Sequence, residues 1–185
     1  MIYSIPNTLT CMRILIIPIL VWAYYIPPGR WGMPVAALLF GIASLTDWLD
    51  GYLARRLNQV SKLGAFLDPI ADKLIVVTVL VVIVDAYGQW SILIPALIII
   101  AREIVVSGLR EWMSELGRRE SVTVSMLGKF KTAAQMMALF LILYYYPIFG
   151  VPVFEVGVWL LCIAATLTLW SMMTYIHRAI KSNTG

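Results

Sequence analysis

The chain has 185 residues, of which 61% are hydrophobic and only 13% are charged. A soluble domain of this length cannot bury so much apolar surface, because a core of finite size still leaves polar residues to face water. The composition therefore favours a membrane protein. The net charge of +4 could indicate a nucleic-acid partner, but membrane topology explains the basic residues better.

Six apolar runs follow one another along the chain. Each can supply a helix of about 20 residues, enough to cross a hydrocarbon core roughly 30 Å thick. We see no soluble domain and no internal repeat, and we predict one all-α, six-helix transmembrane catalytic domain over residues 1–185. The runs cover residues 5–26, 33–56, 66–86, 90–112, 124–147 and 153–177.

Neither the N-terminus nor the two cysteines indicates a cleaved signal peptide or a metal site. Residues 1–10 carry no basic cluster, and no small-residue cleavage site follows the first apolar run, so we expect no cleavable signal peptide. Cys11 and Cys162 lie in apolar runs without metal-ligand spacing. We interpret both as small packed residues.

Charged residues enter the predicted spans at one membrane face. Of the 14 Lys and Arg residues, all except Arg30, that is 13, lie at this face. The positive-inside rule makes it cytoplasmic, with both termini inside. Snorkelling explains many basic residues there, but aspartates are too short to reach far. Ionisable groups within spans usually line a functional cavity, so we place the site there.

Four aspartates are spaced along residues 47–72, DWLDGYLARRLNQVSKLGAFLDPIAD. On a helix, Asp47 and Asp50 share one stripe with two small residues, Gly51 and Ala54. Asp68 and Asp72, four apart, share a face of the next helix. We expect the connecting loop to turn back at Gly64, so that two antiparallel helices present four carboxylates to one another.

Four close carboxylates repel one another and take up protons unless cations hold them. Oxygen ligands suit hard ions, and two Mg²⁺ or Mn²⁺ ions would balance four negative charges. Such a pair can clamp the attacking and leaving oxygens of a phosphoryl centre. Gly51 and Ala54 leave room for a flat base or a diphosphate, and Arg55 can pair with a phosphate oxygen. The alternative is that the acids form salt bridges with Arg55, Arg56 and Lys73.

The spacing in residues 47–72 matches at every position the signature D-x2-D-G-x2-A-R-x8-G-x3-D-x3-D, so the chain resembles the CDP-alcohol phosphotransferases. The resemblance implies a six-helix membrane fold, a homodimer, and an active site open to the cytoplasm. It implies that Asp72 is both a metal ligand and the general base. Residues 6–10 with Arg13 also resemble the N-terminal segment of the family. The implied metal ligands are Asp47, Asp50, Asp68 and Asp72, and the implied contacts to CDP-diacylglycerol are Asn7, Thr10, Gly51, Ala54, Arg55 and Gly64.

Residues 101–118 and 124–136 resemble the bacterial phosphatidylglycerophosphate synthases of this family. The resemblance implies transfer of a phosphatidyl group from CDP-diacylglycerol to sn-glycerol 3-phosphate in the bacterial inner membrane. A phosphorylated acceptor also needs cations beyond the metal pair. Glu103 and Glu111 are candidates to orient the arginines. The basic candidates for the acceptor phosphate are Arg102, Arg110, Lys129 and Lys131; alternatively, all four only set the topology.

Two other functions remain open. The first is the same chemistry with another acceptor, such as inositol phosphate, serine or a second lipid. The second is a cation channel or carrier that uses the aspartates as transport ligands. The carrier is disfavoured, because we expect the acids to gather at one membrane end with none at the far end.

Overall fold

The computed structural model of the protein describes residues 5–25, 31–57, 62–115 and 126–183. Within these ranges, the side chains of residues 5–8, 47–57, 62–63, 65, 110, 113–115, 126–129 and 174–183 are not described. The described residues form six helices: α1 (Ile5–Tyr25), α2 (Gly32–Leu57), α3 (Lys62–Tyr87), α4 (Trp90–Glu115), α5 (Met126–Tyr144) and α6 (Val153–Asn183).

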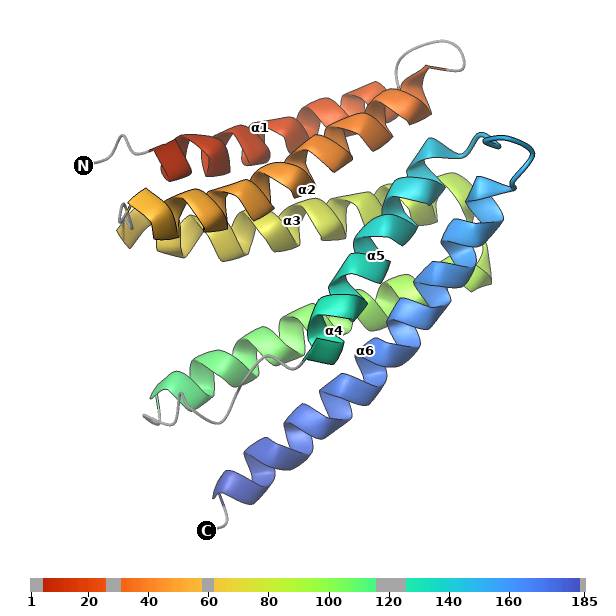
Figure 1. Ribbon diagram of the computed structural model, residues 1–185. Helices are drawn as coiled ribbons and strands as arrows, with labels where there is room; N and C mark the ends of the chain where they lie inside the picture. The colour runs from red at the N-terminus through yellow and green to blue at the C-terminus, as the bar shows by residue number, and fades with distance from the viewer. Residues whose placement is uncertain (1–4, 26–30, 58–61, 116–125, 184–185) are drawn as a thin grey trace.

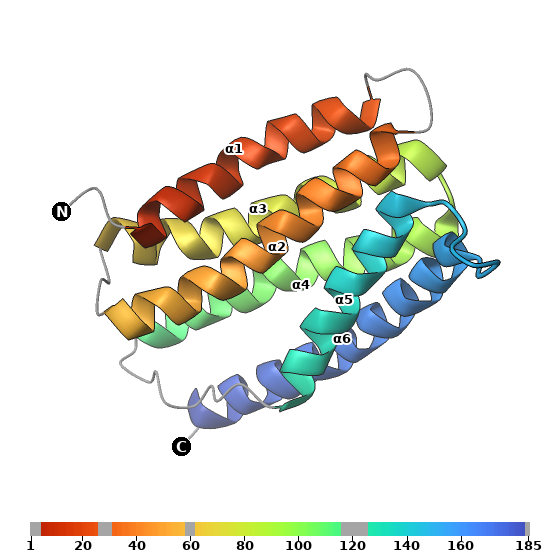
Figure 2. The same cartoon turned by 45° about the horizontal axis from the view of Figure 1, so that its top comes forward.

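The helices form one bundle in which successive helices run in opposite directions (Figure 1). Helix α1 packs against both α2 and α3, α4 packs against α3 and α6, and α5 lies between α2 and α6 (Figure 2). All six helices contribute to a single apolar core. Its fully buried members include Leu20, Phe40, Leu80, Ile99, Leu139 and Leu161. The predicted all-α architecture is therefore confirmed over the described residues.

The outer surface of the bundle is also apolar, because large hydrophobic side chains point outward from every helix. Examples, one from each helix in order, are Leu15, Leu38, Val81, Leu97, Met137 and Trp159. Two described segments, Trp90–Leu109 and Val153–Met173, are long and apolar enough to cross a membrane, and three apolar segments are shorter. Apolar faces this extensive are rare on soluble monomers.

The cysteine prediction needs a correction. Cys11 is exposed on α1, and Cys162 is half-buried on α6. Cys11 lies on the outward face of α1, next to the exposed Met12. It is therefore a small apolar residue of the outer surface, not of the core.

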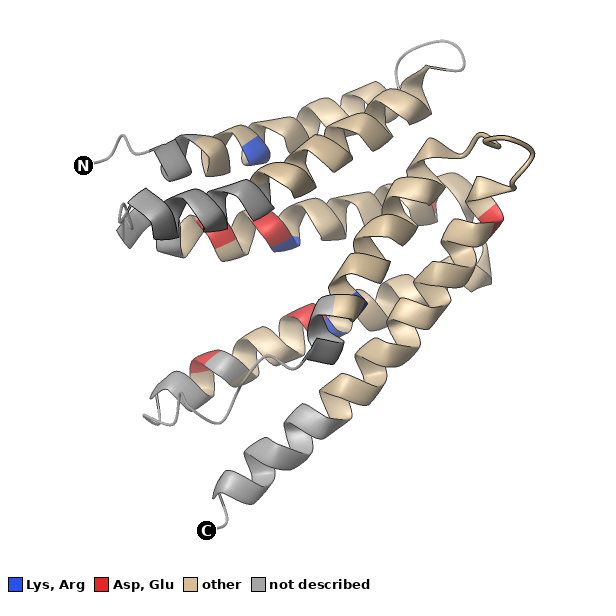
Figure 3. Ribbon diagram, in the orientation of Figure 1, with Lys and Arg blue, Asp and Glu red and all other residues tan. Residues whose placement is uncertain are grey.

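The two ends of the bundle differ in chemistry. At one end, α1, α3 and α5 begin and α2, α4 and α6 end, and Figure 3 places most of the described charged residues toward it. We call it the charged end. The opposite end carries a cluster of rings that includes Tyr87, Tyr145 and Phe154. We call it the aromatic end.

Candidate active site at the charged end

Helix α3 carries two of the four predicted metal ligands. Asp68 and Asp72 lie one turn apart, and both side chains are partly buried. The hydroxyl of Thr10, which is fully buried on α1, donates a hydrogen bond to Oδ1 of Asp68. The structure thus brings together Thr10 and Asp68, two predicted site residues that are 58 positions apart in the chain.

The last turns of α2 lie beside this part of α3. Helices α2 and α3 are in contact, and α1 packs against both. Only residues 58–61 separate the end of α2 from the start of α3, so both helix ends lie at the charged end. Five predicted site residues belong to this end of α2, and their side chains lie outside the described ones: Asp47, Asp50, Gly51, Ala54 and Arg55. The side chain of Asn7 in α1 lies outside them too.

Gly64 does not lie in the loop between the two aspartate helices, so that prediction was wrong. Helix α3 already begins at Lys62, and Gly64 is buried in its first turn. Glycine is common in turns, but it is also needed where helices pack closely, because it has no side chain. Sequence alone could not separate these two uses of glycine.

The basic half of the site lies on α4 and α5. Nη1 of Arg102 forms an ion pair with Oε1 of Glu103, and about a fifth of each side chain is exposed. Lys131 of α5 is only 2% exposed, and it interacts electrostatically with both Arg102 and Glu103. The structure therefore places Arg102 and Lys131 in one cluster. The other two predicted residues, Arg110 and Lys129, have side chains outside the described ones.

A further link joins the acidic and basic halves through Ser107, a residue that the sequence did not single out. Nζ of Lys73 donates a hydrogen bond to Oγ of Ser107, which bridges α3 and α4. Oγ of Ser107 in turn donates to the carbonyl oxygen of Glu103 over 2.5 Å. Lys73 follows Asp72 directly inside an apolar helix, and a basic residue at such a position was the available signal. Arg13, 1% exposed, is a second buried cation at this end.

The donor chemistry fits hard divalent cations. The described candidates, Asp68 and Asp72, are carboxylates on one face of α3, and oxygen donors suit Mg²⁺ or Mn²⁺. Among the described side chains, no three metal-binding residues gather in one group. The two other predicted ligands, Asp47 and Asp50 at the end of α2, have side chains outside the described ones.

Comparison with known proteins identifies the family. A sequence profile of CDP-alcohol phosphatidyltransferases matches residues 3–170. The chain belongs to the CDP-alcohol phosphatidyltransferase family. The resemblance drawn from residues 47–72 is thereby confirmed, and the match extends it over most of the chain.

Three bacterial relatives within this family of phosphatidyltransferases carry the name CDP-diacylglycerol–glycerol-3-phosphate 3-phosphatidyltransferase. Those from Salmonella choleraesuis (strain SC-B67) and Shigella flexneri serotype 5b (strain 8401) are each 49% identical to this chain over 177 residues. The relative from Escherichia coli (strain K12) is 48% identical over 177 residues. Each alignment covers 96% of this chain and 95% of the relative.

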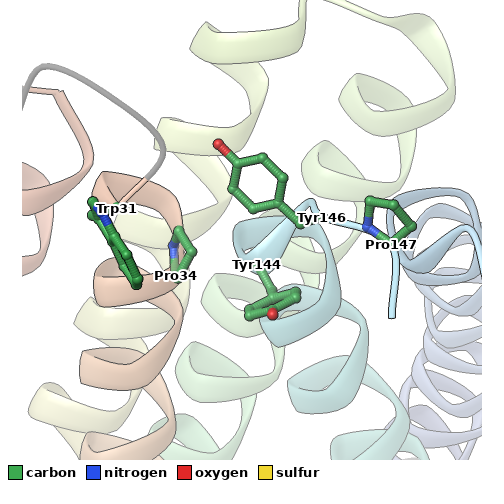
Figure 4. A pocket seen from close by; sticks show the side chains of 5 residues that line it. All are labelled: Trp31, Pro34, Tyr144, Tyr146 and Pro147. Atoms are coloured by element: carbon green, nitrogen blue, oxygen red, sulfur yellow. The ribbon is translucent and has the colours of Figure 1, made fainter. Parts of the chain in front are cut away.

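The aromatic end of this phosphatidyltransferase holds a pocket of a different kind. It has a volume of about 500 Å³ and is lined by Trp31, Pro34, Tyr144, Tyr146 and Pro147 (Figure 4). None of these five side chains is charged or suited to a hard cation. The pocket is therefore a poor place for phosphoryl transfer, and the charged end is the better candidate site.

One argument against a carrier does not hold. Acidic residues were expected only at one end, but Asp85 near the end of α3 and Glu155 near the start of α6 lie at the aromatic end. Oδ2 of Asp85 accepts a hydrogen bond of 2.6 Å from the hydroxyl of Tyr25. The carrier hypothesis is disfavoured instead by membership in a family of phosphatidyltransferases.

Proposed function

We propose that this protein transfers the phosphatidyl group of CDP-diacylglycerol to sn-glycerol 3-phosphate, which yields phosphatidylglycerol phosphate and CMP. The observation that carries the proposal is the similarity, over nearly the full length, to three proteins named for this reaction. The charged end supports it, because acidic side chains on α3 lie near a basic cluster on α4 and α5. Such a site suits a reaction between a lipid diphosphate and a phosphorylated alcohol.

The protein works in the bacterial inner membrane as a six-span homodimer, with both termini and the charged end facing the cytoplasm. The outward-facing apolar side chains on all six described helices support the membrane location, since they bury their surface in lipid. The basic residues support the orientation, because the spans predicted from the sequence put 13 of the 14 on the side where α1, α3 and α5 begin. The homodimer rests on the family resemblance.

The aspartates carry the chemistry. Asp47, Asp50, Asp68 and Asp72 would hold two Mg²⁺ or Mn²⁺ ions, which would supply positive charge to the phosphoryl oxygens. Asp72 removes the proton from the free primary hydroxyl of glycerol phosphate. The resulting alkoxide forms a bond to the lipid-linked β-phosphorus. The bond from that phosphorus to the bridging oxygen breaks, and CMP leaves with the electron pair. The hydrogen bond from Thr10 fixes the orientation of the Asp68 carboxylate.

Different elements hold the two substrates. The CDP moiety lies over the end of α2, where Gly51 and Ala54 leave space and Arg55 pairs with a phosphate oxygen. Gly64, Asn7 and Thr10 complete this side. The acceptor phosphate is held on the other side by Arg102, Arg110, Lys129 and Lys131. Support comes from Nζ of Lys131, which is buried and has no hydrogen-bond partner among the described residues. A buried charge of this kind is costly unless a ligand compensates it.

Turnover of CDP-diacylglycerol by the purified protein tests the proposal. We expect CMP release only with a suitable acceptor, and phosphatidylglycerol phosphate, identified by mass, as the product with glycerol phosphate. Product from inositol phosphate, serine or a second lipid, and none from glycerol phosphate, would identify a different acceptor. No CMP release with any acceptor in the panel would rule out the enzyme.

Chelation tests the metal assignment in the same assay. Excess EDTA should abolish turnover, and added Mg²⁺ or Mn²⁺ should restore it, because four uncompensated carboxylates cannot remain charged at close range. Full activity in excess EDTA would contradict the two-metal site.

A further inference from the structure

Glu103 places a negative charge inside the cluster that is proposed to bind an anion. Its carboxylate is paired with the guanidinium of Arg102, and its charge also acts on Lys131. An acid beside an anion site repels the ligand, and it takes up hydrogen-bond donors that the ligand needs. Holding α4 and α5 together does not by itself explain why an acid lies in this cluster.

The cluster is incompletely satisfied as it stands. Among the described side chains it contains two cations, Arg102 and Lys131, and one anion, Glu103. Within the described part of the chain, neither Nε of Arg102 nor Nζ of Lys131 has a hydrogen-bond partner. A phosphate has more acceptor oxygens than a carboxylate, and it pairs with arginine in a two-pronged geometry. A phosphorylated ligand can thus satisfy more of these donors than Glu103 does.

The main chain of Glu103 is fixed while its carboxylate can exchange partners. Ser107 donates to the carbonyl oxygen of Glu103, and Lys73 on α3 donates to Ser107. These contacts involve the backbone of Glu103 and leave its side chain out. The carboxylate can therefore swing away from Arg102 without disturbing α4.

We propose that Glu103 is an exchangeable counter-ion, which neutralises Arg102 in the empty site and gives it up when the phosphate of the acceptor binds. This inference rests on the proposed function, and it identifies Glu103 as a residue that sets specificity for a phosphorylated acceptor. An acceptor without an anionic group cannot displace the carboxylate, so it meets a site in which Arg102 is already paired. Glu103 is a positioning residue in this scheme, because it acts through Arg102 and does not touch the reacting atoms.

The test is the affinity of Glu103→Gln, in the purified full-length protein, for inorganic phosphate and for glycerol phosphate. Glutamine keeps the size of the side chain but removes the charge that competes with the ligand. We expect the Kd for inorganic phosphate and the KM for glycerol phosphate to fall about 5- to 30-fold, which corresponds to about 1–2 kcal/mol. The KM for CDP-diacylglycerol should not change. Glu155→Gln, the same change at the aromatic end, is the matched control and should leave both constants unchanged.

Other results would overturn the inference. If Glu103→Gln raised the KM for glycerol phosphate, Glu103 would hold Arg102 in place instead of competing for it. Unchanged affinities would show that the acid does not compete. Arg102→Ala distinguishes failure of this inference from failure of the proposed acceptor site. A raised KM for glycerol phosphate in this variant would support the acceptor site, whereas an unchanged KM would contradict it. Should Glu103→Gln not fold, Glu103→Asp, whose shorter side chain weakens the pair, should lower both constants by a smaller factor.

Discussion

Lys131 is one of two described basic residues at the charged end that are almost fully buried. It is almost fully buried on α5, its ammonium has no hydrogen-bond partner among the described residues, and one acid, Glu103, lies near it. Removing an ammonium from water costs several kcal/mol even after the surroundings relax. A negatively charged ligand beside this ammonium would offset that cost.

We therefore expect Lys131→Met to separate function from stability. Methionine fills a similar volume without charge, so the KM for glycerol phosphate should rise about 10- to 150-fold, the value of a charged hydrogen bond. The Tm should stay the same or rise, because the variant no longer buries an unpartnered charge. Steady-state kinetics and thermal unfolding in detergent measure both. Lys181→Met in the last turns of α6 is the control, and an equal rise in its KM would point to a general effect of charge.

At the scale of elements, the contact between α5 and α6 depends on a residue without a side chain. A Cβ on Gly157 of α6 would lie 2.8 Å from Cγ1 of Ile142, 3.0 Å from its backbone nitrogen, and 3.0 Å from Cβ of Leu141. Two of these atoms belong to or adjoin the backbone of α5 and cannot move independently. Gly157 thus sets how closely the two helices approach.

Gly157→Ala should destabilise the protein by about 1–3 kcal/mol, the usual cost of overpacking. A lower Tm in detergent would record this. Gly108→Ala on α4 is the matched control, because its Cβ would meet nothing within 4 Å. That variant should keep or raise the Tm, since alanine favours a helix by up to about 1 kcal/mol over glycine. Equal losses in both variants would argue against the proposed contact.

The turn between α5 and α6 contains a strained aromatic residue. Ile148 and Val151 exchange backbone hydrogen bonds of 3.3 and 2.9 Å. Phe149 and Gly150 between them have φ values of 51° and 81°. A two-residue turn of this type favours Asn-Gly, because both central residues need positive φ. Phenylalanine has a steric cost there, and its side chain is fully exposed, so the apolar ring can insert into surrounding lipid.

Phe149→Asn should therefore raise the Tm of the detergent-solubilised protein by relieving about 1 kcal/mol of strain. The same variant should lose the contribution of the ring to anchoring in lipid. Comparing the Tm in detergent with the Tm in lipid bilayers measures the two effects separately. A lower Tm in detergent would mean that the phenylalanine stabilises the turn itself.

At the scale of the whole molecule, the alternating directions of the helices collect the charged ends on one side. Three helices begin and three end there within the described chain, so residues that are distant in sequence, such as Thr10 and Asp68, come into contact. The same alternation places the turn at Gly88 and the turn at residues 145–152 at the aromatic end. A membrane around the bundle would separate these two sets of loops.

Single cysteines in a background without Cys11 and Cys162 test this orientation. A cysteine at position 60 should resist an impermeant reagent applied from outside the cell, whereas a cysteine at position 88 should react. The physical reason is the positive-inside rule, by which an excess of basic residues would keep the charged end in the cytoplasm. The opposite labelling pattern would show that the charged end faces the outside of the cell.

The helices could be predicted closely from the sequence, because each apolar run is as long as a helix needs to be. The first run was expected over residues 5–26, and α1 covers Ile5–Tyr25. The largest differences occur where helices continue into polar sequence. Helix α3 begins at Lys62 instead of residue 66, and α6 continues to Asn183 instead of residue 177. Hydrophobicity reports the part of a helix that avoids water, and it does not report where the backbone hydrogen bonds end.

The family could be assigned from the sequence, because the spacing of the four aspartates, the glycines and Arg55 is specific without any knowledge of contacts. Which of these and other residues meet follows from the packing of the helices. It joined Thr10 to Asp68 and Lys73 to Ser107, and it placed the ion pair of Arg102 and Glu103 beside a buried Lys131. Spacing along a helix fixes which residues share a face, but the packing of one helix against another decides what that face touches.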